Sequence, residues 1–153
     1  MEYRIPSTRW ANDCVQFFID TMCNAAVRKG SGMDEDDYSY ALFPDSAGKS
    51  ARLFRYRTVE AQLGLATRAP EDETFADDVP VKFERTSDGY IYSVMIPAKY
   101  LLPLQLASGN AFGCGFFIPN SDEKGRYTSA ITCAADGGTC EKRPETWPVA
   151  VFE

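Results

Sequence analysis

The sequence of 153 residues contains no histidine. Histidine is the side chain that enzymes use most often as a general acid or base near neutral pH, and it is a frequent ligand of zinc and of haem iron. Its absence excludes much of this chemistry and leaves a cysteine nucleophile without its usual base. We therefore expect a protein that is not itself an enzyme.

Basic residues are also scarce. Lys and Arg number 16 against 22 Asp and Glu, which gives a net charge of -6. Nucleic acids and anionic membranes attract proteins through a basic surface, so neither partner is expected. No apolar run approaches the ~20 residues that cross a bilayer, and residues 1–9 lack the apolar segment of a signal peptide. The sequence predicts a soluble protein, and export stays open because the chain can begin inside a longer precursor.

The cysteine pattern gives no metal motif. Five cysteines are present, and neither a C-x-x-C pair nor a Cys/His cluster occurs, which removes support for a structural zinc site. The odd number leaves at least one thiol free or paired between chains under oxidising conditions. Cys133 and Cys140 flank a Gly-Gly turn and are the candidate pair. Two reduced thiols in a surface loop are the alternative.

Short alternating segments dominate the chain. In residues 14–20 the odd-numbered side chains Val15, Phe17 and Ile19 point to one side, and the even-numbered ones, with Gln16 in the middle, point to the other. An Asp-Gly pair at 88–89 joins two further alternating runs and predicts a hairpin. The predicted strands are 14–20, 38–43, 51–57, 59–66, 79–84, 90–96, 111–118, 127–133 and 148–152, with one helical turn within 98–104. Eight or nine short strands predict a single antiparallel β-sandwich domain over 1–153.

An acidic loop follows the first predicted strand. Asp34, Glu35, Asp36 and Asp37 are consecutive, and four neighbouring carboxylates repel one another. They are either well solvated or share a cation such as calcium, which takes oxygen ligands from loops. Asp34, Asp36 and Asp37 are the candidate calcium ligands, although their spacing does not match a helix-loop-helix calcium loop.

Three stretches in register resemble carbohydrate-binding module family 9 and its relatives, which share a sandwich fold with the DOMON group. They are residues 10–20 (WANDCVQFFID), 88–97 (DGYIYSVMIP) and 113–126 (GCGFFIPNSDEKGR), with Trp147 close to the end of the chain. The resemblance extends from Trp10 to Phe152. It implies a jelly-roll-like β-sandwich that accompanies secreted polysaccharide-degrading enzymes such as glycoside hydrolases. An extracellular or periplasmic location is the corresponding expectation.

The resemblance also implies a sugar site between two tryptophans, together with structural calcium. Trp10 matches the first tryptophan and Trp147 the second. An indole offers a flat apolar face that can cover the C–H face of a pyranose, while the hydroxyls of the sugar find hydrogen-bond partners. The candidate ligand contacts are Trp10, Gln16, Phe43, Phe117, Arg126 and Trp147, and no catalytic residue is assigned.

Several positions depart from the family pattern. Gln16 stands where family members carry an acidic residue, and it can still hydrogen-bond a hydroxyl. Ala41 and Phe43 replace an arginine and an asparagine, and Phe117 and Pro119 replace a glutamine and an asparagine. The alternative function is therefore a structural or protein-interaction domain whose sugar site has been lost and filled by apolar side chains.

The region before Trp10 is short by comparison with the family. Family members carry several strands there, whereas nine residues precede Trp10 in this sequence. The chain is then either the C-terminal part of a larger module or a shortened sandwich with an exposed sheet edge. An exposed edge pairs readily with another chain, so a homodimer is the corresponding prediction.

Overall fold

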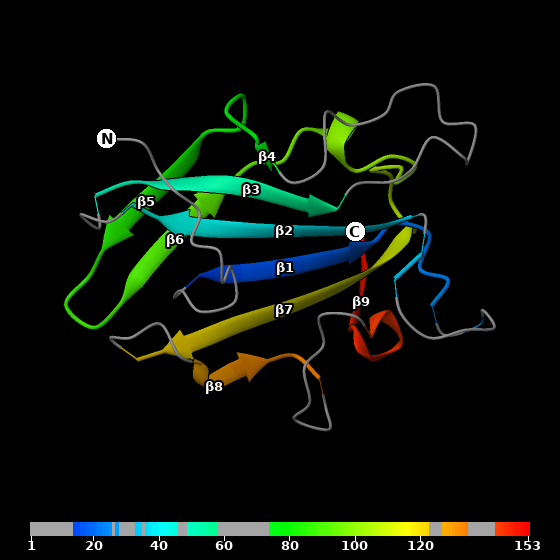
Figure 1. The fold of residues 1–153 in the computed structure, drawn as a ribbon. Coiled ribbons are helices and arrows are strands. Elements are labelled where there is room, and N and C mark those ends of the chain that lie inside the picture. Colours follow the sequence, from blue (N-terminus) through cyan, green and yellow to red (C-terminus); the bar gives the residue numbers. More distant parts are fainter. Residues whose placement is uncertain are drawn as a thin grey trace.

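The computed structural model describes residues 14–25, 27, 33–34, 36–45, 49–57, 74–122, 127–134 and 143–153. Its strands are β1 (Val15–Asp20), β2 (Asp37–Pro44), β3 (Ala51–Arg57), β4 (Thr74–Phe75), β5 (Val81–Arg85), β6 (Tyr90–Val94), β7 (Ala111–Ser121), β8 (Tyr127–Thr132) and β9 (Val149–Val151). Two short 3-10 helices are η3 (Ala98–Tyr100) and η4 (Pro144–Thr146). The strand order in the seven-stranded sheet is β4-β3-β2-β1-β7-β8, and β9 also pairs with β7 (Figure 1).

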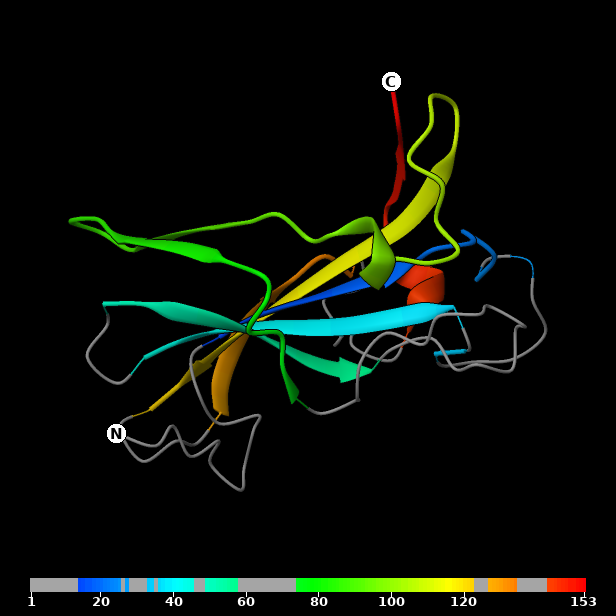
Figure 2. The ribbon, with the colours of Figure 1, turned by 90° about the horizontal axis from the view of Figure 1, so that it is seen from above.

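The second sheet is the β5–β6 hairpin. Its two strands pair from Val81 opposite Val94 to Arg85 opposite Tyr90, as the Asp-Gly turn predicts. Seen from above, the hairpin and η3 lie over one face of the large sheet (Figure 2). All strand pairs are antiparallel, and the predicted antiparallel β-sandwich is confirmed.

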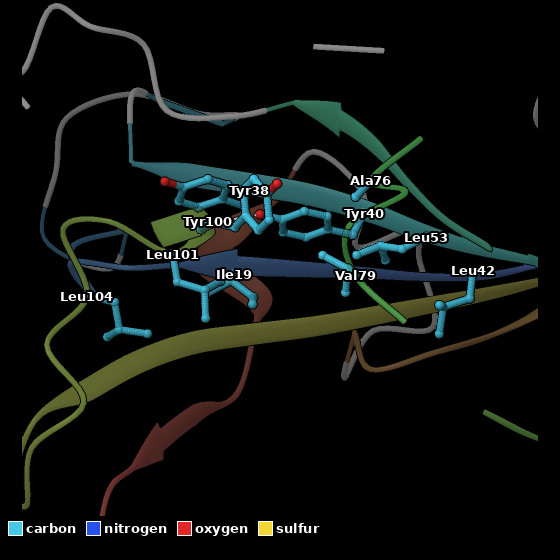
Figure 3. Close-up of a cluster of buried hydrophobic side chains, with 10 residues drawn as sticks. All are labelled: Ile19, Tyr38, Tyr40, Leu42, Leu53, Ala76, Val79, Tyr100, Leu101 and Leu104. Atoms are coloured by element: carbon cyan, nitrogen blue, oxygen red, sulfur yellow. Dashed lines mark hydrogen bonds between the residues drawn. The ribbon is translucent and has the colours of Figure 1, made fainter. Parts of the chain in front are cut away.

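The first strand divides the large sheet into two faces. We call the side of Val15, Phe17 and Ile19 the first face and the side of Gln16 and Phe18 the second face. The hairpin and η3 cover the first face, where the main core forms (Figure 3). This core contains Ile19, Tyr38, Tyr40, Leu42, Leu53, Ala76, Val79, Tyr100, Leu101 and Leu104. Alternation thus predicted correctly that β1 separates two faces of the sheet.

Two tyrosines connect β2 to the segment around η3. The Tyr40 hydroxyl donates to the Tyr100 carbonyl at 2.6 Å, and the Tyr38 hydroxyl donates to the Leu102 carbonyl at 2.7 Å. Both residues are almost fully buried, so water cannot pair with their hydroxyl groups, and these two bonds supply the hydrogen-bond partners instead. The helical turn predicted within 98–104 is confirmed as η3 and is held in place by these contacts.

One short strand was not predicted. The sequence predicted no strand between 66 and 79, yet Thr74–Phe75 forms β4 beside β3. This expectation was wrong at Phe75 because its ring packs edge-on against the buried Phe54 at 5.2 Å between centroids. The strand predicted over 59–66 lies outside the described residues.

Candidate functional site

The second face of the large sheet brings three predicted contacts together. Gln16 on β1 is opposite Ala41 on β2 and Phe117 on β7, and Phe43 lies two residues beyond Ala41 along β2. These side chains share a face because side chains separated by an even number of residues point the same way. Gln16 is fully buried, and Phe43 and Phe117 are 3% and 7% exposed. These three predicted positions therefore form one patch, in which Phe117 and Phe43 belong to two neighbouring clusters of apolar side chains.

Gln16 places a polar group at the centre of this patch. Its Nε2 donates to the Cys14 Sγ at 3.7 Å, and its buried Oε1 has no hydrogen-bond partner among the described residues. A buried carbonyl without a donor costs roughly 1–3 kcal/mol of folding free energy relative to one that is paired. The unpaired side-chain carbonyl of Gln16 on the second face therefore costs folding free energy, and fold stability does not explain its presence.

Trp147 follows η4 and lies over the same face. Its ring stacks on Phe18 with centroids 5.4 Å apart and planes 17° apart, and the residue is 5% exposed. Its backbone N–H donates to the Pro144 carbonyl at 3.0 Å. In this structure Trp147 is a packed residue instead of an open platform, because Phe18 occupies one face of the indole. Contact between Trp147 and a sugar remains a prediction.

Gly115 makes room for the indole. A Cβ atom built on Gly115 would lie 2.7 Å from Cδ1 of Trp147, closer than real contacts allow. Gly113, two residues away, leaves the same kind of space for Asp20, whose Cβ would be 3.1 Å away. The alternating Gly-Cys-Gly pattern within a predicted strand was the sequence signal for this close approach, since glycine inside a strand marks such sites.

Substituting Gly115 tests this packing. We expect Gly115→Ala to lower the free energy of unfolding by about 1–3 kcal/mol, because the added methyl group overpacks the indole. Gly89→Ala is the control, because its Cβ would meet nothing closer than 4.0 Å. Chemical denaturation of both variants measures the difference. Equal stability of the two would contradict the close contact between Gly115 and Trp147.

Two predicted contacts are not placed by the structure. Trp10 and Arg126 lie outside the described residues. The second half of the proposed tryptophan pair and one polar contact therefore stay predictions. Of the candidate pair Cys133 and Cys140, Cys140 is also outside the described residues, while Cys133 has a free thiol that accepts a hydrogen bond from the Phe116 N–H at 3.3 Å.

A small hollow borders the edge of Trp147. It has a volume of about 40 Å³ and is lined by Asp20, Cys23, Ala25, Gly113, Pro144, Glu145, Trp147 and Val149. A water molecule requires roughly 10–15 Å³ on this scale, so the hollow accommodates a few waters and not a sugar ring. Any sugar site at Trp147 would require the neighbouring side chains to move.

The acidic loop packs against the end of β1. Asp20 accepts hydrogen bonds from the backbone N–H groups of Met22 and Ala25, both at 3.1 Å. Asp36 accepts from the same Met22 N–H at 3.0 Å and from the Asn24 side chain at 3.0 Å. Asp37 accepts from the Asp34 N–H at 2.7 Å. The structure thus brings the predicted residues Asp34, Asp36 and Asp37 together and adds Asp20.

This arrangement changes the acidity of two carboxyl groups. Burial, followed by hydrogen bonding to the Asp34 side chain, raises the pKa of Asp36 to about 7. Burial also raises the pKa of Asp37 to about 7, opposed by the hydrogen bond from the Asp34 backbone. Within the described residues, no three Asp, Glu or Cys side chains are arranged to hold a metal ion. The residues as placed do not form a metal centre, and calcium binding stays a prediction.

No helix in the described part of the chain is both long and apolar enough to span a membrane.

Solved structures give the fold a family context. A family 9 carbohydrate-binding module from Caldicellulosiruptor kristjanssonii in complex with glucose matches 96% of this chain at 18% identity, with a TM-score of 0.63. The same module in complex with cellotriose matches 99% at 17% identity, with a TM-score of 0.61. This chain spans 62% and 63% of the length of those solved chains. No family model matches the sequence, and no curated protein matches it. The chain has the β-sandwich fold of family 9 carbohydrate-binding modules.

Proposed function

We propose that this chain is a non-catalytic carbohydrate-binding domain that holds a sugar on the second face of its large sheet, around Gln16. The likeness to modules solved with glucose and cellotriose supports a glucose-type ligand. Gln16, Phe43 and Phe117 support the location, because the structure gathers these three predicted contacts on one face. Trp10, Arg126 and Trp147 complete the proposed site, with the indoles as stacking surfaces.

The observation that carries the proposal is the Gln16 side-chain carbonyl. Its oxygen is buried and receives no hydrogen bond from the part of the chain that the structure describes, and a sugar hydroxyl is a donor of suitable size. Sugar sites combine apolar walls with a few polar groups that fix orientation, which is the composition of this patch. Because Gln16 is fully buried, the side chains above it move when the sugar enters.

Titration with glucose and cellotriose tests the site. We expect saturable binding by calorimetry and by tryptophan fluorescence, and we expect Gln16→Met to weaken it by roughly 10- to 100-fold, the equivalent of one lost hydrogen bond to a buried group. Gln105→Met is the matched control, since Gln105 is exposed beyond η3. Binding that Gln16→Met leaves unchanged would place the sugar elsewhere.

A structural or protein-interaction domain is the second candidate, and the filling of the patch favours it. Phe43 packs edge-on against Phe54 at 6.1 Å between centroids, and Trp147 stacks on Phe18. In this alternative the second face is a second apolar core with no ligand. Absence of any response to glucose and cellotriose at millimolar concentration, with the protein folded, would favour it over the sugar site.

Location and metal content follow from the same proposal. A carbohydrate-binding domain would act in an extracellular or periplasmic location, beside a polysaccharide-degrading enzyme. Structural calcium held by Asp34, Asp36 and Asp37 is part of the same proposal. The likeness to the solved modules supports the setting. Calcium titration, described below, tests the metal independently of the sugar.

A further inference from the structure

Among the described strands at the edges of the large sheet, β8 is the longest. The strand at the opposite edge, β4, has 2 residues. The strand β9, which pairs with β7 as β8 does, has 3 residues. Such short strands offer little backbone for pairing with another chain. β8 has 6 residues and pairs only with β7 among the described strands. This edge is therefore the part of the sheet most able to accept a further strand.

The backbone of β8 has unused hydrogen-bonding groups on its outer side. The Cys133 N–H donates inward to the Phe116 carbonyl at 3.3 Å, and hydrogen-bonded pairs alternate along an antiparallel ladder. Ala130 and Thr132 therefore direct their N–H and C=O groups away from β7, whereas the register of the two strands shifts at Thr128 and the alternation ends there. Pro119, which has no N–H, is opposite Ala130, as this alternation requires. No strand in the described part of the chain covers these groups.

The sequence of β8 lacks the charges and prolines that commonly protect an edge, and its register shift is confined to the end near Thr128. It reads Tyr-Thr-Ser-Ala-Ile-Thr, with no lysine, no acidic residue and no proline. Proteins usually prevent edge pairing by placing charges or proline on an exposed edge strand. By contrast, the edge strand β5 of the hairpin carries Lys82, Glu84 and Arg85. β8 is uncharged although a quarter of the whole chain is charged.

Apolar side chains lie beside this edge on the first face. Ile131 is 65% exposed, and Phe116 on the neighbouring strand is 40% exposed. Ile131 is paired with Ile118 across the ladder. The hairpin and η3 cover the core formed by β1, β2 and β3, and neither Phe116 nor Ile131 is a member of that core. A strand added beside β8 would shield Ile131 from water.

We propose that a second copy of this chain pairs with β8 in antiparallel orientation, with Ile131 next to the twofold axis. Each copy then uses the outward groups of Ala130 and Thr132, and the two large sheets become continuous. A twofold interface brings residues close to their own copies, so any charge on β8 would meet a like charge. The absence of charge suits a second copy, and the two Ile131 side chains face each other across the axis.

The mass of the protein in solution tests this dimer. Light scattering during size-exclusion chromatography, from micromolar to the highest attainable concentration, is expected to show a dimer mass. Ile131→Lys is expected to weaken the dimer by ~10-fold or more, because it places two like charges within reach. Ala130→Pro is expected to act similarly by removing an outward N–H that β7 does not use.

Ile91→Lys is the matched control. Ile91 is 50% exposed on β6, another uncharged edge strand, so its substitution introduces the same charge at a comparable surface position. Thermal melts show whether each variant is folded. A dimer that Ile131→Lys and Ala130→Pro dissolve and Ile91→Lys preserves supports the proposal. A monomeric wild-type protein, or a dimer that only Ile91→Lys dissolves, overturns it. Neither result depends on sugar binding.

Discussion

Trp147→Ala is expected to lower the free energy of unfolding by about 3–5 kcal/mol, the range for a large aromatic residue removed from a core. The indole is 5% exposed and stacks on the fully buried Phe18. Its removal leaves a cavity beside Gly115, where no side chain exists to fill the space. Because small domains are stable by only about 5–15 kcal/mol, this single change removes a large share of the total. Urea unfolding followed by circular dichroism measures it.

Trp147→Phe and Tyr90→Ala serve as comparisons. Phenylalanine retains part of the stacking on Phe18, so the loss should be smaller than for alanine. Tyr90 is 52% exposed on the hairpin, so Tyr90→Ala removes an aromatic ring with little change in core packing. A Trp147→Ala variant as stable as Tyr90→Ala would show that the indole is free of the core. Such a free ring would be available as an open stacking platform.

In the presence of a metal chelator, the stability of the protein is expected to fall as the pH rises from about 4 to about 7. The pKa of Asp36 and of Asp37 is raised to about 7 in the folded protein, against about 3.9 in an unfolded chain. The folded state therefore binds more protons in this interval, and proton linkage makes unfolding easier as they are lost. Melting temperatures between pH 4 and pH 8, with a metal chelator present, should decrease by several degrees.

Two substitutions test whether the acidic loop causes this pH dependence. Asp36→Asn should raise the melting temperature at pH 8 and flatten the profile, because the amide is never charged. Asp88→Asn, in the exposed hairpin turn, should leave the profile unchanged. A profile that stays steep in Asp36→Asn would place the responsible groups elsewhere.

Calcium can be tested in the same assay. Binding to Asp34, Asp36 and Asp37 would raise the melting temperature at pH 8 and have little effect at pH 4, where Asp36 and Asp37 carry protons. No change at pH 8 on addition of calcium would contradict the metal prediction. It would also leave the carboxylates as hydrogen-bond acceptors that order the loop after β1.

The elements that could be predicted from sequence depend on short-range patterns. Alternation in residues 14–20 predicted the two faces of β1, and the Asp-Gly turn predicted the hairpin. These signals act within a few residues, so one sequence is enough to find them. β4 was not found because its pairing depends on Phe75 meeting Phe54, a contact between distant segments with no local pattern.

The sequence predicted where the candidate site lies, but it did not predict how deeply its side chains are buried. Gln16, Phe43 and Phe117 were expected to line one surface, and the register of three strands places them together. The burial of Trp147 could not be derived from its neighbours in sequence, because it depends on a glycine in β7 and a phenylalanine in β1. The Gly-Cys-Gly pattern could have indicated that a side chain approaches the strand closely, but it does not identify that side chain.

The position of β1 in the sheet affects the order in which the chain can fold. Of the described strands, β1 is synthesised before the others, yet one of its two neighbours is β7, which begins at Ala111. Until synthesis has passed that point, β1 pairs with β2 alone, and its other edge lacks its native partner. Contacts between such distant segments slow folding, because a long loop must close before they form. During synthesis, this unfinished edge of β1 is therefore the place where we expect chaperones to bind.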